Sequence, residues 1–200
     1  MKKMMMIAAM MIAAISANAQ NEVGQITLKP MVGINLATMT KMDDSKMRVG
    51  LAAGVEAEYG VAENFSVTAG VLYSMQGVKF SASEGGVSID ETLKLDYINI
   101  PILANYYIIP GLAIKAGIQP AFKASAKVKA EASYQGESAS DTEDLDGAKG
   151  FYLSIPVGLS YEYQSFVLDA RYNLGVTKAF DGGDSKHSWF MFTLGYKFAL

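Results

Sequence analysis

The sequence predicts an all-β protein, specifically an eight-stranded antiparallel up-and-down transmembrane β-barrel. Three observations lead to this prediction: an export signal at the N-terminus, alternation of apolar and polar residues in eight segments, and alternation of longer and shorter connections between those segments. Half of the residues are hydrophobic and only 18% are charged, which is apolar for a water-soluble chain of 200 residues.

The N-terminus has the organisation of a secretory signal peptide. Lys2 and Lys3 form a positive region, an uncharged apolar stretch follows, and Ala-Asn-Ala at 17–19 supplies small residues for cleavage. We therefore expect residues 1–19 to be a cleaved signal peptide and residues 20–200 to form one outer-membrane β-barrel domain. A membrane-anchoring helix is the alternative, but the apolar run is shorter than the about 20 residues that span a bilayer.

Eight segments alternate with a period of two, as strands do, because successive side chains of a strand point to opposite faces. The strongest signal lies in residues 111–130, where every even position is apolar and several odd positions are lysines. In chain order, the predicted strands cover residues 28–39, 49–59, 65–75, 98–108, 111–130, 151–163, 166–176 and 190–198.

The connections between these segments alternate in length. They cover residues 40–47, 60–64, 81–91, 109–111, 131–150, 162–165 and 178–187. This alternation is typical of barrels with short periplasmic turns and longer extracellular loops. We interpret residues 131–150 as a solvated acidic loop. Pro101, Pro120 and Pro156 predict bulges or irregular pairing, because each proline removes a donor from the ladder.

The apolar face of each segment is continuous and bulky, whereas the other face is too rich in Gly and Ala to coat an exterior. We therefore expect the apolar face to meet lipid, since a sheet can span a membrane only by closing on itself. A soluble barrel with its apolar face around a ligand is the alternative. The expected aromatic girdles are Tyr59, Phe65, Tyr106, Tyr107, Tyr161, Tyr163, Phe166 and Phe198 at the periplasmic end and Phe80, Phe151, Trp189 and Phe190 at the other.

The polar face predicts a network of charges inside the barrel. An eight-stranded barrel is just wide enough for its interior to be filled by side chains. The expected barrel-interior charge network consists of Glu56, Glu58, Asp96, Lys115, Lys123, Glu162, Asp169, Arg171 and Lys197. Both signs occur, so the charges can pair as buried charges must. We expect a salt-bridged plug with negligible ion conductance; a narrow pore for small solutes is the alternative.

Catalysis is the third alternative, in the form of a lipid-modifying or proteolytic barrel enzyme. His187 is the one histidine and is expected in the last extracellular loop, beside Ser185, Ser188, Asp181 and Asp184. These residue types could form a Ser/His/Asp arrangement, but Ser and Asp are common in any loop. We therefore expect no catalytic residue and no enzymatic activity.

No cofactor or metal is expected. Asp43, Asp44 and the acidic residues of 141–146 lack the ligand spacing and glycine of a calcium loop. The chain has no cysteine, and its net charge of −3 without a basic run argues against binding nucleic acid.

Several motifs resemble a known family. Residues 95–107 contain Leu-x-Tyr-Ile-x-Ile-Pro, residues 33–35 read Gly-Ile-Asn, and residues 195–198 read Gly-Tyr-Lys-Phe. Together with a signal peptide that ends in Ala-Gln, they resemble the PorT-like outer-membrane β-barrel protein family of Bacteroidetes-type bacteria. The resemblance covers essentially the whole mature chain. It implies an eight-stranded barrel in the outer membrane of a Gram-negative bacterium, and it brings no catalytic residues.

The expected function is therefore that of a non-enzymatic outer-membrane barrel with a structural or loop-mediated interaction role in the envelope. The expected partners are outer-membrane lipid and lipopolysaccharide, the outer-membrane barrel assembly machinery, and a protein partner at the extracellular loops.

Overall fold

The computed structural model describes residues 23–42, 45–84, 87–134, 137–180 and 183–200. Within these residues the chain is all-β, and its strands form one antiparallel sheet. The strands are β1 (Ile26–Met39), β2 (Ser45–Ala62), β3 (Phe65–Glu84), β4 (Val87–Asn99), β5 (Ile102–Ile109), β6 (Leu112–Tyr134), β7 (Glu137–Asp144), β8 (Phe151–Tyr163), β9 (Phe166–Gly175), β10 (His187–Tyr196) and β11 (Phe198–Ala199).

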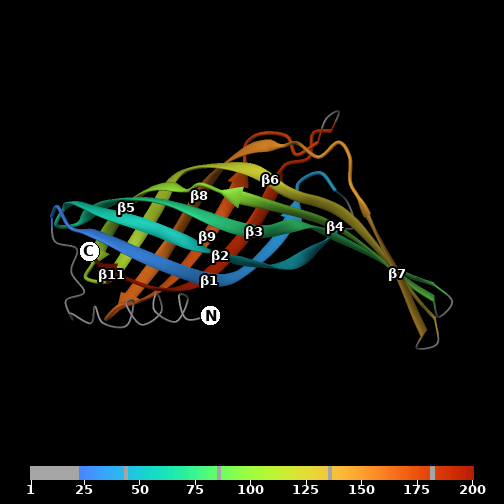
Figure 1. The fold of residues 1–200 in the computed structure, drawn as a ribbon, viewed down its shortest axis with the longest axis horizontal. Helices are drawn as coiled ribbons and strands as arrows, with labels where there is room; N and C mark the ends of the chain where they lie inside the picture. The colour runs from blue at the N-terminus through green and yellow to red at the C-terminus, as the bar shows by residue number, and fades with distance from the viewer. Residues whose placement is uncertain (1–22, 43–44, 85–86, 135–136, 181–182) are drawn as a thin grey trace, which may run out of the picture.

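The sheet closes into an eight-strand ring (Figure 1). In order around the ring, the strands are β1, β2, β3, the pair β4/β5, β6, β8, β9 and β10. The ring closes because β10 pairs with β1 from Met31↔Gly195 to Met39↔His187. β4 and β5 occupy one position, interrupted at Ile100 and Pro101. The predicted eight-stranded antiparallel up-and-down barrel is confirmed.

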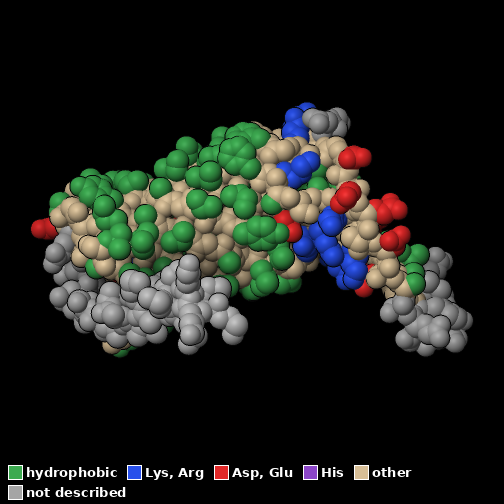
Figure 2. Space-filling model, viewed as in Figure 1, with side chains coloured by type: hydrophobic (Ala, Val, Ile, Leu, Met, Phe, Trp, Pro, Cys, Tyr) green, Lys and Arg blue, Asp and Glu red, His purple; other side chains and the backbone are tan. Residues whose placement is uncertain are grey.

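The alternation in the sequence explains which face of each strand points outward. In β9, Phe166, Leu168 and Leu174 are exposed, whereas Asp169 and Arg171 are buried. Exposed apolar and buried polar side chains alternate in this way around the ring, and apolar side chains are spread over the face of the barrel that Figure 2 shows. An apolar exterior around a polar interior is the pattern of a barrel that faces lipid.

Short turns join the strands at the end of the barrel where β1 begins and β11 lies (Figure 1). Pro110 and Gly111 connect β5 to β6, and Gly111 has a φ of 85°, where a Cβ atom would lie 2.5 Å from the Glu162 carbonyl oxygen. Glycine is favoured here because it lacks that atom. Gln164, in the β8–β9 turn, also has a positive φ of 56°.

At the opposite end, four strands continue beyond the ring and form an extension that we call the arm (Figure 1). The arm consists of residues 79–84 of β3, 87–94 of β4, 127–134 of β6 and 137–144 of β7. The prediction that residues 81–91 and 131–150 are loops is therefore wrong for most of their length. Their backbone groups pair in ladders, even though their polar side chains gave no clear alternation.

The prolines interrupt ladders without shifting the register. The pairs Asn99↔Ala121 and Ile102↔Ile118 flank the gap at Pro101, where the Ile100 amide donates to the Pro120 carbonyl oxygen at 2.8 Å. Pro156 pairs with Asn173 of β9, but the β6–β8 ladder skips it. Irregular pairing is thus present, but the predicted bulges are not at these prolines.

The register shifts lie elsewhere: between Met47 and Ala52, Gly60 and Ala62, Asp96 and Tyr97, and Tyr107 and Ile109.

The segment 1–19, interpreted as a cleaved signal peptide, lies outside the described residues, so its removal stays a prediction. Among the described residues, no helix is long and apolar enough to cross a membrane.

Candidate functional site

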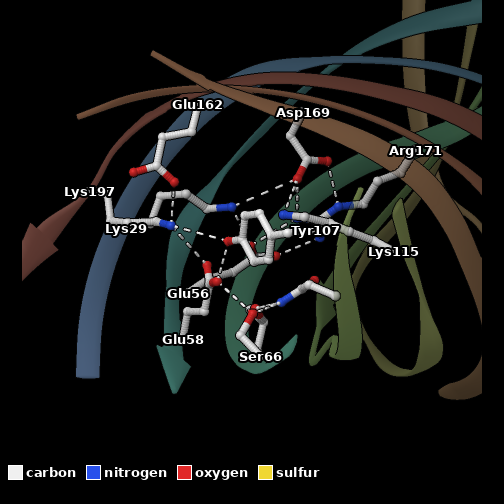
Figure 3. Close-up of polar contacts among 12 residues, drawn as sticks. Lys29, Glu56, Glu58, Ser66, Tyr107, Lys115, Glu162, Asp169, Arg171 and Lys197 are labelled. Carbon is white, nitrogen blue, oxygen red and sulfur yellow. Dashed lines mark hydrogen bonds and ion pairs between the residues drawn. The ribbon is translucent and has the colours of Figure 1, made fainter. Parts of the chain in front are cut away.

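The barrel interior is the candidate site, and an ion-pair cluster fills its middle (Figure 3). Arg171 of β9 reaches across the barrel to Glu56 of β2, with Nη1–Oε1 and Nη2–Oε2 distances of 2.5 and 2.9 Å. This two-point contact uses the planar fork of the guanidinium, which matches a carboxylate. Strands from opposite sides of the ring are thereby joined through its centre.

Asp169 and two lysines complete this cluster. Asp169 Oδ1 accepts from Arg171 Nε at 2.6 Å, and Asp169 Oδ2 accepts from Lys115 Nζ at 2.8 Å. Lys29 Nζ lies 2.8 Å from Glu56 Oε2 and 3.7 Å from Asp169 Oδ2. All of these side chains are almost fully buried, so each charge depends on its neighbours rather than on water.

A second cluster lies nearer the end with short turns. Lys197 Nζ is 2.5 Å from Glu162 Oε2 and 3.3 Å from Glu58 Oε2. Glu58 Oε1 also accepts hydrogen bonds from the hydroxyls of Tyr107 at 2.5 Å and Ser66 at 2.6 Å. Across the two clusters, four cationic side chains meet four carboxylates, so the buried charges balance.

Amide and hydroxyl side chains form the next layer. Asn35 Nδ2 donates to Ser74 Oγ at 2.9 Å, and Gln76 Nε2 donates to the same Ser74 oxygen at 3.0 Å. The Tyr152 hydroxyl donates to Gln76 Oε1 at 2.9 Å and lies 3.3 Å from Asn99 Oδ1. This layer separates the ion pairs from the apolar part of the interior.

Aromatic and methionine side chains fill the half of the interior nearer the arm. Tyr152 stacks on His187 with a centroid distance of 4.4 Å, and Tyr97 meets both rings edge-on at 4.6 and 5.1 Å. Trp189 lies against Tyr152 at 6.0 Å. The surrounding buried residues are Met39, Leu72, Val78, Leu95, Ala121, Ala148, Ala179 and Met191. We call this half the aromatic core.

Seven of the nine residues predicted for the charge network are brought together by these contacts. They are Glu56, Glu58, Lys115, Glu162, Asp169, Arg171 and Lys197.

Asp96 and Lys123 lie elsewhere, which corrects the prediction. Asp96 is on the outer face, where it accepts from the Tyr73 hydroxyl at 2.8 Å and lies 3.5 Å from Arg48. The Lys123 side chain lies at the rim and donates to the Ala148 carbonyl oxygen at 2.8 Å. Asp96 has the same parity in β4 as the outward Ile98, whereas Leu95, Tyr97 and Asn99 are buried, so the alternation of β4 places Asp96 outward. Lys123 pairs with the inward Tyr97, but its side chain lies beyond the packed interior.

Lys29 was missed by the sequence reasoning, although it lies at the centre of the first cluster. Its flanking positions Leu28 and Pro30 are apolar, and Thr27 and Met31 share its buried face. The alternation was therefore present in β1, but the small residue Gly33 weakens it.

Three aromatic residues predicted for the outer girdles lie on the inner face instead. Tyr107 hydrogen-bonds to Glu58 inside the barrel, Trp189 is 1% exposed in the aromatic core, and Phe80 packs against that core. Other predicted girdle residues do lie outward, including Tyr59, Tyr161 and Phe166.

His187 is not in a loop, which corrects a second expectation. It begins β10, and its ring is buried against Tyr97 and Tyr152. Ser188, the next residue, bonds to the outward Tyr172 hydroxyl at 2.8 Å, on the opposite face of the strand. Within the described residues, no carboxylate contacts His187, so a Ser/His/Asp arrangement is not assembled there.

The acidic residues considered as metal ligands give no site in the described part of the chain. No group of three or more His, Cys, Asp or Glu side chains there is arranged to hold a metal ion. Asp43 and Asp44 lie outside the described residues.

An apolar exterior, a closed ring and a packed ionic interior together define a small barrel of the outer-membrane type. The sequence agrees, because residues 18–181 match the family described as outer membrane protein beta-barrel domain, and the chain belongs to that family. The family places the chain in the outer membrane. No curated protein sequence matches this chain.

Three solved structures illustrate the resemblance. Ail, the attachment invasion locus protein of Yersinia pestis, is 16% identical over 88% of this chain and 100% of its own, with a TM-score of 0.48. Neisserial surface protein A is 12% identical over 92% and 99%, with a TM-score of 0.48. OprG from Pseudomonas aeruginosa is 11% identical over 90% and 98%, with a TM-score of 0.39. These values are too low to support any inference about activity.

Proposed function

We propose that this protein is a non-enzymatic barrel of the Gram-negative outer membrane that presents its extracellular arm to a protein partner. The observation that carries the proposal is the arm, which extends a four-stranded sheet beyond the ring (Figure 1). A barrel needs only short loops to close, so these extended strands serve something other than closure.

The arm ends in a strand with a free edge. β7 pairs with β6 and with no other strand among the described residues. The Leu145 amide donates to the Ala126 carbonyl oxygen, so in an antiparallel ladder the backbone groups of Ser140, Thr142 and Asp144 point away from β6. The Thr142 amide indeed donates to its neighbour Asp141 Oδ1 at 2.8 Å rather than to β6.

An unpaired strand edge can accept an extended segment of another protein as an additional strand. The sequence of β7 contains Glu137, Asp141, Glu143 and Asp144 and no basic residue. Two copies of this edge would repel each other, because charges on edge strands oppose self-association. The partner that fits is therefore a basic segment in an extended conformation.

The packed interior supports this proposal over the alternatives of a pore and an enzyme. The ionic clusters and the aromatic core occupy successive levels of the barrel, which favours a plug over a solute path. The buried position of His187 disfavours catalysis through that residue. The proposal includes the barrel assembly machinery as a partner during insertion and a signal peptide removed before it.

We also propose membership of the PorT-like group. The Leu-x-Tyr-Ile-x-Ile-Pro motif runs through β4 to the break at Pro101. Its alternate residues Leu95, Tyr97 and Asn99 are all buried in the interior. The motif thus supplies packing for the barrel interior, which supports the resemblance.

The test is binding of an extended basic peptide to the barrel in lipid nanodiscs. We expect a fluorescein-labelled peptide of alternating Lys and Val to bind the native protein, and a Glu–Val peptide of equal length not to bind. Ser140→Pro removes an outward N–H without touching the β6 ladder and should weaken binding about tenfold, the value of one hydrogen bond. Ser140→Ala is the matched control and keeps that N–H.

Equal binding by Ser140→Pro and the native protein would show that the edge of β7 is not the docking site. Both variants keep every acidic side chain, so non-specific attraction between charges is held constant. Heat-modifiable migration on a gel checks that each barrel is folded.

A further inference from the structure

Five lysines of β2, β3, β4 and β6 share the outer face at the base of the arm. Figure 2 shows basic side chains gathered there, just where the apolar exterior of the barrel ends. We call them the lysine row: Lys46 of β2, Lys79 of β3, Lys94 of β4, and Lys127 and Lys129 of β6. Neither the ring nor the free edge of β7 explains why five lysines gather here.

The ladder register places these lysines opposite one another. Lys46 pairs with Lys79, and Lys94 pairs with Lys127. Directly opposite residues share a face of the sheet with Cβ atoms about 5 Å apart, and like charges in such pairs are destabilising. The presence of two destabilising lysine pairs next to each other therefore requires an explanation.

The lysine row continues the lipid-facing surface. Ile98, Asp96 and Lys94 follow one another at alternate positions of β4, and Ile98 pairs with Phe122, which is exposed on the barrel exterior. Asp96 bonds to Tyr73, another outward residue. Lys94 therefore lies on the same face as the last apolar residues.

The height above those residues matches the headgroup layer. Four residues of strand separate Ile98 from Lys94, or about 13 Å along the strand and about 9 Å along the membrane normal at a tilt near 45°. The headgroup region adds about 5–8 Å on each side of the hydrocarbon, and lysine stems bend toward the charge that they contact. The ammonium groups can thus reach lipid phosphates.

Acidic neighbours neutralise part of the row but not all of it. Asp90 lies 3.1 Å from Lys79, Glu131 lies 2.7 Å from Lys129, and Asp144 lies 4.0 Å from Lys127. Hydrogen bonds from Ser81 and Lys79 hold the pKa of Asp90 below its ordinary value, so it stays charged.

Lys94 makes no ion pair within the described residues, and its cross-strand partner is another lysine, Lys127. Within the described residues the row's unpaired lysines are thus Lys46 and Lys94, and the Lys94–Lys127 pair lies at the level nearest the apolar exterior.

We propose that the lysine row binds the phosphate groups of outer-leaflet lipid, the lipid A part of lipopolysaccharide. Lysines suit this role because each is a compact point charge on a flexible stem, worth about 1 kcal/mol beside an anionic membrane surface. The continuity with the lipid-facing exterior favours a lipid phosphate over a soluble one. Bound phosphate offsets the repulsion between the opposed lysines and fixes the height of the arm above the membrane.

The test is native mass spectrometry of the folded mature protein in detergent. We expect bis-phosphorylated lipid A to bind about thirtyfold more tightly than the same lipid without phosphates, as two lost lysine contacts would require. Lys94→Gln/Lys127→Gln should bind phosphorylated lipid A about thirtyfold more weakly than the native protein. Lys178→Gln/Lys186→Gln, with the same change in charge in the β9–β10 connection, is the matched control and should bind normally.

Equal binding of the two lipids by the native protein would overturn the proposal without reliance on any variant. Full binding by Lys94→Gln/Lys127→Gln would also overturn it. Competition by inorganic phosphate at the concentration of the lipid would identify a site for soluble anions and so reject the lipid as its ligand.

Discussion

The two halves of the barrel interior are filled by opposite kinds of chemistry. In the half near the short turns, four cations and four carboxylates from several strands satisfy one another. In the half near the arm, Trp189, Tyr152, Tyr97 and His187 pack with methionine and aliphatic side chains. Both kinds of side chain fill the barrel. Removing one member of the ionic clusters leaves a buried charge without its partner, whereas apolar side chains can relax in part around a removed neighbour.

The largest effect is expected from Glu56→Gln in the ionic half. The variant keeps the shape of the side chain but leaves Arg171 and Lys29 without their main carboxylate. The free energy of unfolding should therefore fall by about 4 kcal/mol. The measurement is a urea titration followed by the heat-dependent shift of the band on a gel.

The matched control is the double variant Glu56→Gln/Arg171→Met, which restores the balance of charges. We expect it to be more stable than Glu56→Gln alone. If the single variant were as stable as the native protein, the ionic half would not depend on paired charges, and the contrast between the halves would fail.

A somewhat smaller effect is expected from Trp189→Ala in the aromatic core. Loss of a buried indole should lower the free energy of unfolding by about 3 kcal/mol, because the cavity can collapse only in part. Trp189→Phe should cost less than about 1.5 kcal/mol, since it keeps most of the volume. The same urea titration measures both, and equal losses in the two variants would argue for a specific role of the indole N–H.

The smallest effect is expected from His187→Phe. The ring stacks on Tyr152 and makes no hydrogen bond within the described residues, so an apolar ring of similar size should change stability by less than about 1 kcal/mol. The variant is compared with the native barrel in the urea titration at neutral pH. A loss of several kcal/mol would reveal a partner of the imidazole and a polar function in the aromatic core.

The sequence predicted the ring well because lipid on one side and a packed interior on the other impose a strict alternation. Residues such as Leu168 and Arg171 lie on the faces that their parity indicates. Most of the ionic clusters followed from the same rule, since a charged residue on the inward face of a narrow barrel must meet an opposite charge.

Most of the errors share a physical origin, which is that alternation gives no signal where both faces of a strand meet water or where the apolar run has not yet begun. The arm has polar residues on both faces, so β7 looked like a loop. Asp96 has the parity of the outward Ile98, so the prediction that placed it inside departed from the alternation of its own strand. His187 starts β10 before the apolar alternation begins, so it was assigned to the preceding loop.

The seam between β1 and β10 joins strands from the two ends of the ring, so the ring stays open until the last long strand is in place. The central ion pairs form in the same order, because Glu56 on β2 can pair with Arg171 only after β9 is in place. An incomplete chain therefore holds unpaired charges at the centre of its future interior. Closure of the ring and the pairing of Glu56 with Arg171 therefore depend on the same late strands, and a chain that ended before β9 would leave Glu56 with Lys29 as its cation.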